Sequence, residues 1–225
     1  MFGSVKSVNS LNKVISYSKT KKLKANIIYC PPYTLIKSFV DKTKKSNIKI
    51  GAQDCHAQPN YGPFTGAISS KMIKDLGGKF VIIGHSETRA ENDNKKINLK
   101  IKSALNEKLN VILCIGEKLI DKRKNKTKYV LKKQLLEGLK NLKNLNKVII
   151  AYEPVWSIGT GIIPSENDLK KNIRFIRNTL KISKQFTKSK ILYGGSVNPK
   201  NIKNLMRIDT VSYTHLTLPT KEGVW

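Results

Sequence analysis

The sequence has few of the features that mark specialised classes of protein. Its 225 residues include three cysteines, Cys30, Cys55 and Cys114, with no C-x-x-C spacing, so neither a disulfide framework nor a zinc site is indicated. No leader of charged, apolar and small residues opens the sequence, and no apolar run approaches the roughly 20 residues needed to cross a bilayer. These absences predict a soluble, cytoplasmic protein with reduced thiols, no bound metal and no membrane partner.

Acidic residues are also scarce. The chain has 15 Asp and Glu against 43 Lys and Arg, which gives a net charge of +28. Such an excess can mark a protein that binds nucleic acid. Here the lysines are spread along the whole chain, and no RNP-like aromatic motif, zinc-finger spacing or basic-region heptad accompanies them. A compositional background is the favoured interpretation, and a nucleic-acid or other anionic partner is the alternative.

The chain alternates short apolar runs with longer polar segments. Six runs are typical of strands: ANIIYC (25–30), IKIGAQ (48–53), KFVIIGH (79–85), NVILCIGE (110–117), KVIIAYEP (147–154) and KILYGGS (190–196). The polar segments carry apolar residues at helical spacing, and these stripes are Ile97, Ile101, Leu105 and Leu109; Leu131, Leu135, Leu139 and Leu142; and Leu169, Ile173, Ile176 and Leu180. Such alternation predicts an α/β domain with a parallel sheet, as a doubly wound sheet or a (β/α) barrel.

Two helix starts are marked by capping residues. Ser165, with Asp168 three residues later, resembles a capping box. Asn198 followed by Pro199 has the favoured order of an N-cap and a first helical proline. We therefore expect helices to begin at these two points.

Reactive side chains follow three of the predicted strands. His85 follows one strand in GHSETR at the expected start of a helix, Glu153 ends another, and Gly194, Gly195 and Ser196 follow a third. In parallel α/β folds the chemistry gathers at these carboxyl ends. A neutral histidine near a helix N-terminus can polarise a carbonyl, a carboxylate can remove a neighbouring carbon-bound proton, and a Gly-Gly-Ser turn offers N–H groups to a phosphate. Taken singly, each residue is as easily structural.

The stretch AYEPVWSIGTG (151–161) suggests that Glu153 lies under a flap. Pro154 ends the strand because it has no N–H for a sheet ladder. Gly159 and Gly161 permit hinge conformations, and Trp156 is bulky enough to cover a site. The alternative is an ordinary loop with a solvated glutamate.

Three of these motifs resemble a known family. GHSETR, YEPVWSIGTG and LYGGSVNP are similar to the three signature loops of the triosephosphate isomerase family, and the resemblance covers Met1 to about Thr210. It implies a homodimeric (β/α)8 TIM barrel. Enzymes of this kind interconvert dihydroxyacetone phosphate and glyceraldehyde 3-phosphate in glycolysis and gluconeogenesis, with no metal or organic cofactor.

The resemblance also implies roles for single residues. Glu153 is the catalytic base and His85 the electrophile, under a closing lid. Gly159, in the lid, and Ser196 bind the substrate phosphate through N–H groups, and Glu87 supports the site. The loop QDCHAQPNYGPFTGAIS (53–69) resembles the family's dimer loop, with Thr65 near its tip.

The two ends of the sequence depart from the family pattern. The family's first strand, with its charge-stabilising lysine, has no counterpart before Met1. Residues 211–220 read VSYTHLTLPT, which resembles a translated sequencing adapter; a divergent strand is the alternative. We therefore expect a barrel domain at 1–210 with about six native βα units, lacking the family's first and eighth strands. A non-native tail would occupy 211–225, and the chain as written would be inactive.

Two other functions stay open at this stage. The first is a basic, non-catalytic module that binds an anionic polymer through its lysines. The second is another phosphate-binding barrel of the same architecture. Both are disfavoured because neither would need His85 and Glu153 together with a lid.

Overall fold

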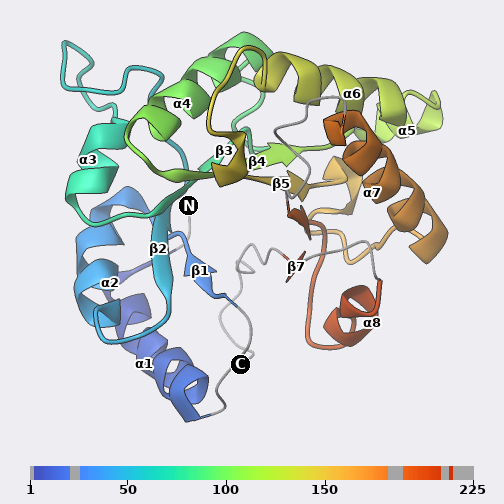
Figure 1. The fold of residues 1–225 in the computed structure, drawn as a ribbon. Helices are drawn as coiled ribbons and strands as arrows, with labels where there is room; N and C mark the ends of the chain where they lie inside the picture. The colour runs from blue at the N-terminus through green and yellow to red at the C-terminus, as the bar shows by residue number, and fades with distance from the viewer. Residues whose placement is uncertain (1–2, 21–25, 182–189, 209–212, 215–225) are drawn as a thin grey trace. The chain divides into compact units, whose positions relative to one another are not determined.

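Both halves of the chain alternate strands and helices (Figure 1). The computed structural model describes residues 3–20, 26–181, 190–208 and 213–214. The chain divides into two compact units, the first comprising Met1–Ile83 and Leu99–Val111 and the second Gly84–Asn98 and Ile112–Trp225. The helix α4 (Asn94–Asn106) and the strand β4 (Asn110–Ile115) contribute residues to both units.

The first unit contains three parallel strands. In it β1 (Ile28–Tyr29) pairs with β2 (Lys49–Ala52), and β2 pairs with β3 (Phe80–Ile83). The helical segments are α1 (Val5–Thr20), η1 (Tyr33–Leu35), α2 (Ile36–Thr43) and α3 (Ser70–Asp75). Because α2 contacts both β2 and α1, the helices bury one side of this sheet (Figure 1).

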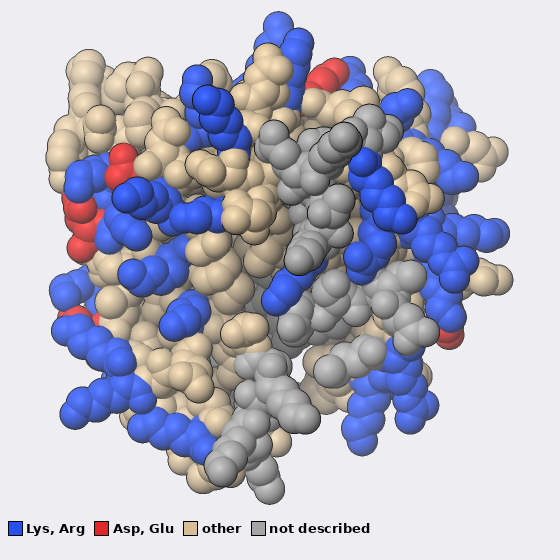
Figure 2. Space-filling view, in the orientation of Figure 1, with Lys and Arg blue, Asp and Glu red and all other residues tan. Residues whose placement is uncertain are grey.

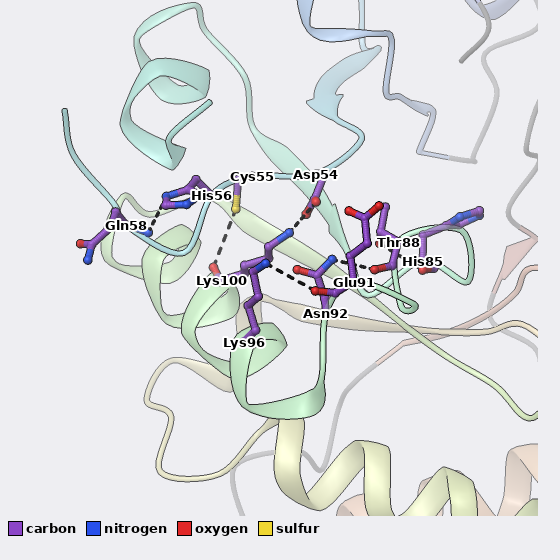
Figure 3. A network of polar contacts seen from close by, with 10 residues as sticks. All are labelled: Asp54, Cys55, His56, Gln58, His85, Thr88, Glu91, Asn92, Lys96 and Lys100. Atoms are coloured by element: carbon purple, nitrogen blue, oxygen red, sulfur yellow. Dashed lines mark hydrogen bonds and ion pairs between the residues drawn. The ribbon is translucent and has the colours of Figure 1, made fainter. Parts of the chain in front are cut away.

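The interior of the first unit is apolar, with one ionic contact beside it. Phe39 of α2 is fully buried and stacks on Tyr29 of β1, with ring centroids 4.8 Å apart. The Lys100 ammonium, which is largely buried, lies 2.5 Å from the Asp54 carboxylate, and the Cys55 thiol donates to the Lys100 carbonyl (Figure 3). The contact fixes the loop after β2 to the second half of α4.

The second unit holds the remaining strands. Its sheet order is β4, β5 (Val148–Tyr152), β6 (Ile191–Tyr193) and β7 (Tyr213–Thr214), with β5–β6 and β6–β7 parallel. Its helical segments are α5 (Leu119–Arg123), α6 (Thr127–Gly138), η2 (Leu145–Lys147), η3 (Val155–Ser157), α7 (Glu166–Lys181) and α8 (Ile202–Met206). Helices α6 and α7 pack against each other beside the strands (Figure 1).

All six predicted strands are present, and the predicted helical stripes are buried. Two stripes extend past their helices, because α4 ends before Leu109 and α6 ends before Leu139. Residues with left-handed backbone angles end these segments, with Lys108 at φ 60° after α4 and Asn141 at φ 55° after α6. Hydrophobic spacing shows which residues are buried, but it does not show where the chain leaves the helix.

Only one of the two predicted helix starts is confirmed. The Ser165 hydroxyl accepts the Asp168 N–H at 3.1 Å, and α7 begins at the next residue. The prediction at Asn198 is wrong, since α8 begins at Ile202 and not at Pro199. The Asn198 side chain instead accepts from the Lys200 and Asn201 N–H groups and holds a turn before the helix.

We expect Ser165→Ala to lower the free energy of unfolding by about 1 kcal/mol, because the first turn of α7 loses its side-chain cap. Urea unfolding at constant m-value measures the change. Ser165→Asp keeps an accepting oxygen and is the matched control. An equal loss in both variants would show that the cap is not the cause.

The segment 211–225 lies outside the described residues except for Tyr213 and Thr214, which form β7. Its predicted non-native origin, and the domain boundary at 210, stay predictions. Within the described ranges, no helix is long and apolar enough to cross a membrane.

Candidate active site

Glu153 is buried at the end of β5, where the sequence predicts it. Its N–H donates to the Ile115 carbonyl of β4 at 2.7 Å. On the other side of β5, the Gly194 N–H after β6 donates to the Tyr152 carbonyl. The side chain is 2% exposed. The backbone that carries the carboxylate is therefore held on both sides, at the carboxyl edge of the sheet.

Two glycines allow the neighbouring strands to approach Glu153 this closely. A Cβ added to Gly116 would lie 1.6 Å from the Glu153 carbonyl oxygen. A Cβ added to Gly194 would lie 2.7 Å from the Glu153 Cγ. Since real Cβ atoms do not come so near, both positions require glycine for steric reasons.

His85 faces Glu153 within the second unit. Its Nε2 lies 3.7 Å from the Glu153 Oε1, and its side chain is 12% exposed. Neither of these two atoms has a hydrogen-bond partner within the part of the chain that the structure describes. Buried polar atoms are normally satisfied, so two facing each other without partners mark a place for a polar ligand.

The expected helix start at His85 is wrong. Residues after His85 form turns, and α4 begins only at Asn94, where the Asp93 carboxylate accepts the Lys96 N–H. Asn92 donates to the Thr88 carbonyl and holds the turn in place (Figure 3). A helix dipole at His85 therefore does not explain a neutral imidazole.

A local hydrogen bond orients the His85 ring. The Glu87 backbone N–H donates to the His85 Nδ1 at 3.3 Å. An Nδ1 that accepts carries no proton, so the neutral ring has its hydrogen on Nε2, the atom that faces Glu153. The predicted support from Glu87 comes from its backbone, since its side chain is 76% exposed.

Burial is the main influence on the Glu153 carboxylate. Desolvation raises the pKa of Glu153. Four weaker influences lower this pKa: the charge interaction with His85, hydrogen bonds from the Cys114 side chain and the Ser86 backbone, and the Arg89 charge. The balance is a raised pKa, which makes the carboxylate a stronger base than an exposed one.

The Arg89 guanidinium fixes the loop that carries His85. It donates to the Cys114 carbonyl and to the Asn94 side chain, each at 2.9 Å. Burial lowers the pKa of Arg89. The positive charge lies close enough to oppose the desolvation of Glu153, and sequence reasoning gave it no role.

The segment for which a flap is predicted follows Glu153 and is here called the lid (residues 154–163). Gly159 and Gly161 have positive φ values of 69° and 74°, conformations that favour glycine. The Gly161 N–H donates to the Ser196 hydroxyl at 3.3 Å, and this hydroxyl donates to the Ser157 carbonyl at 2.5 Å. Ser196 is thus joined to the lid, whereas Gly159 stands exposed at the lid's tip.

A second buried carboxylate, Glu117 after β4, was missed by the sequence reasoning. It accepts from the Trp156 indole at 2.9 Å and from the Tyr152 hydroxyl, and burial raises the pKa of Glu117. The Lys122 ammonium lies 3.6 Å from the centroid of the Trp156 ring. The sequence contained evidence for this residue, because Glu117 ends the predicted strand NVILCIGE just as Glu153 ends another.

The described residues contain no group of three or more His, Cys, Asp or Glu side chains that could hold a metal ion. The chemistry that this arrangement offers is proton transfer. A buried base faces an imidazole N–H across a short gap, with a glycine-rich lid beside them.

Comparison with known proteins identifies the family. A family model described as triosephosphate isomerase matches residues 1–212. The chain belongs to the triosephosphate isomerase family. It is 44% identical over 186 residues to the triosephosphate isomerase of Thermodesulfovibrio yellowstonii, covering 80% of this chain and 75% of that protein. It is 38% identical over 205 residues to that of a Wolbachia from Brugia malayi, covering 91% and 82%.

A solved triosephosphate isomerase has the same fold. The crystal structure of the enzyme from Bartonella henselae is 32% identical, has a TM-score of 0.86, and covers 95% of this chain and 87% of that one. The predicted TIM-barrel class is therefore confirmed, and the doubly wound alternative is excluded. The family match also argues against the alternative that the chain is a non-catalytic module that binds an anionic polymer.

Proposed function

We propose that the chain carries the active site of an enzyme that interconverts dihydroxyacetone phosphate and glyceraldehyde 3-phosphate, a step of glycolysis and gluconeogenesis. The 225-residue chain as written is itself inactive in this proposal. The observation that carries this proposal is the pair of Glu153 Oε1 and His85 Nε2, 3.7 Å apart and each without another partner among the described residues. The family match gives the substrate.

Glu153 is the base in this proposal. Its carboxylate takes the proton from the carbon next to the substrate carbonyl, and the electron pair of that C–H bond forms the double bond of an enediolate. The His85 Nε2–H donates to the oxygen that becomes negative. The proton of the neighbouring hydroxyl passes through the His85 Nε2 to the former carbonyl oxygen, and Glu153 returns its proton to the adjacent carbon. Product and substrate therefore contain the same atoms, and no cofactor is required.

Ser196 and Gly159 are the proposed phosphate ligands, through their N–H groups. The contact between Ser196 and the lid supports this, because a ligand bound at Ser196 would lie against the lid. A closed lid excludes water, which strengthens the electrostatic contacts and protects the enediolate.

The assembly and cellular location are further parts of the proposal. Two copies associate through the loop 53–69, where Thr65, Tyr61 and Phe64 are exposed, the last two at 66% and 41%. Sedimentation equilibrium should give twice the chain mass of 25.4 kDa, and a monomer would contradict this part. A cytoplasmic location belongs to the same proposal, and the family match supports it.

The experiment that tests the function is the conversion of dihydroxyacetone phosphate in the presence of a chelator. It is run on the 225-residue chain and on a chimera that carries the first and last strands of the Wolbachia relative. We expect conversion in the chimera and none above buffer in the 225-residue chain. Glycerol 3-phosphate should inhibit the chimera competitively, because this compound keeps the phosphate but has no carbonyl. Absence of conversion in both proteins would overturn the proposal.

We expect only weak, sequence-independent retention on heparin or DNA, lost at moderate salt. On the visible face, Lys and Arg side chains are scattered among other residues (Figure 2), and dispersed cations neutralise phosphates without reading bases. Salt elution from a heparin column and DNA binding at physiological salt measure this. Tight, sequence-dependent binding would revive the nucleic-acid alternative.

A further inference from the structure

We propose that Ser157 is a positioning residue for the lid: its hydroxyl ties the two limbs of the lid to each other and to Tyr193 on β6. The role of Ser157 in holding the lid does not depend on the proposed function, but its expected effect on ligand binding does. All the residues involved lie in the second unit.

The Ser157 hydroxyl lies between three parts of the chain. Ser157 is fully buried at the base of the lid. Its Oγ lies 2.8 Å from the Ile162 carbonyl oxygen, on the opposite limb, and 3.1 Å from the Tyr193 hydroxyl. Its own carbonyl accepts from the Ser196 hydroxyl. The hydroxyl thus joins the two limbs of the lid to Tyr193, and the Ser157 backbone carbonyl adds a link to the loop after β6.

The direction of these hydrogen bonds follows from the number of protons. A carbonyl oxygen can only accept, so Ser157 gives its single hydroxyl proton to Ile162. Tyr193 must then donate to the Ser157 Oγ. Burial raises the pKa of Tyr193, which agrees with a phenol that keeps its proton. The result is a chain of hydrogen bonds from Tyr193 through Ser157 to Ile162.

The surroundings leave room for this chain of bonds. A Cβ on Gly195 would lie 2.1 Å from the Tyr193 hydroxyl oxygen and 2.6 Å from the Ser157 Oγ. Gly195 is therefore needed for the Tyr193–Ser157 contact as well as for its own turn.

The tip of the lid has much less to hold it. Added Cβ atoms on Gly159 and Gly161 would meet nothing within 4 Å. The tip's link to the loop after β6 is the 3.3 Å bond from the Gly161 N–H to Ser196. The lid is thus held at its base, and loss of the Ser157 hydroxyl should release both limbs.

The first test is amide hydrogen exchange of residues 158–163 in the 225-residue chain without ligand. We expect Ser157→Ala to speed exchange about 3- to 10-fold, the effect of losing one net hydrogen bond. Tyr193→Phe removes the donor and should do the same if Ser157→Ala does not fold. The double variant should exchange no faster than the single variants, because both changes break one chain of bonds. Unchanged exchange, or additive effects, would overturn the proposal.

Ligand binding gives a second readout that a merely structural serine would not change. Calorimetric titration with glycerol 3-phosphate should show about 3- to 10-fold weaker binding in Ser157→Ala, because a smaller fraction of lids is in the binding-competent state. Ser165→Ala is the matched control, which should lose stability but not affinity. This titration is made in the chimera. If the parent chimera does not bind the probe, the proposed function fails, while the exchange experiment still decides the role of Ser157.

Discussion

Replacing Glu153 with glutamine is expected to lower kcat by roughly 10²–10⁴, the usual contribution of a general base. The amide has nearly the same shape, so the fold should persist, but it cannot take the carbon-bound proton facing His85. The rate is measured in the chimera with the relative's first and last strands. Circular dichroism of the same sample reports whether the fold is intact.

Glu166→Gln is the matched control for this substitution. Its side chain is 65% exposed at the start of α7, where it pairs with Lys170. We expect the rate of this variant to stay within about twofold of the parent, since exposed pairs of this kind contribute little. Undiminished isomerisation in Glu153→Gln would remove Glu153 as the base.

The same glutamine variant should be more stable than the parent at neutral pH. Burial raises the pKa of Glu153 above its unfolded value, so the folded state binds the proton more tightly than the unfolded state. The stability from this group is present below the unfolded pKa and is lost as pH rises through the raised folded pKa. Glutamine does not titrate, so its advantage should appear as pH rises through this range and disappear in acid. Urea unfolding between about pH 4 and pH 8 tests this.

Gly116→Ala is expected to cause the largest structural loss. The added Cβ would lie 1.6 Å from the Glu153 carbonyl oxygen and 2.5 Å from its carbonyl carbon, so backbone must move. We expect destabilisation at or above the about 1–3 kcal/mol typical of overpacking. Activity should fall further than stability alone explains, because the displaced backbone carries the base. Urea unfolding and steady-state kinetics measure the two effects.

Gly138→Ala is the control for a glycine that has room. A Cβ there would meet Leu113 and Ile97 at 3.8 and 3.9 Å, ordinary contact distances, and the residue is the last of α6. We expect unchanged or slightly higher stability, since alanine is the better helix former. Equal damage from both substitutions would show that the close approach at Gly116 is not the cause.

Much of the fold follows from patterns that the sequence displays directly. Each of the six apolar runs contains a strand, and the stripe on α7 is buried as its spacing predicts. Helix ends were less predictable. Left-handed backbone at Lys108 and Asn141 stops two helices, and the Asn198 side chain holds a turn where a helix start was expected.

The site shows the same division between pattern and contact. Strand ends and the family resemblance predict Glu153, His85 and Ser196, but the orientation of the His85 ring depends on a hydrogen bond from the Glu87 backbone. This contact depends on the conformation of the turn after β3, which the spacing of apolar residues does not predict. Glu117 also ends a predicted strand, so its position could have been predicted. Its contact with Trp156 could not, because Trp156 lies 39 residues further along the chain.

The most direct test of proton transfer through Glu153 is the conversion of dihydroxyacetone phosphate in heavy water, followed by proton NMR. An enediolate that Glu153 reprotonates should give glyceraldehyde 3-phosphate with solvent deuterium on the carbon next to the aldehyde, because the carboxylate proton exchanges with solvent during turnover. Glu153→Gln should lose conversion and labelling together. Conversion or labelling that persists at the parental rate in Glu153→Gln would contradict the account.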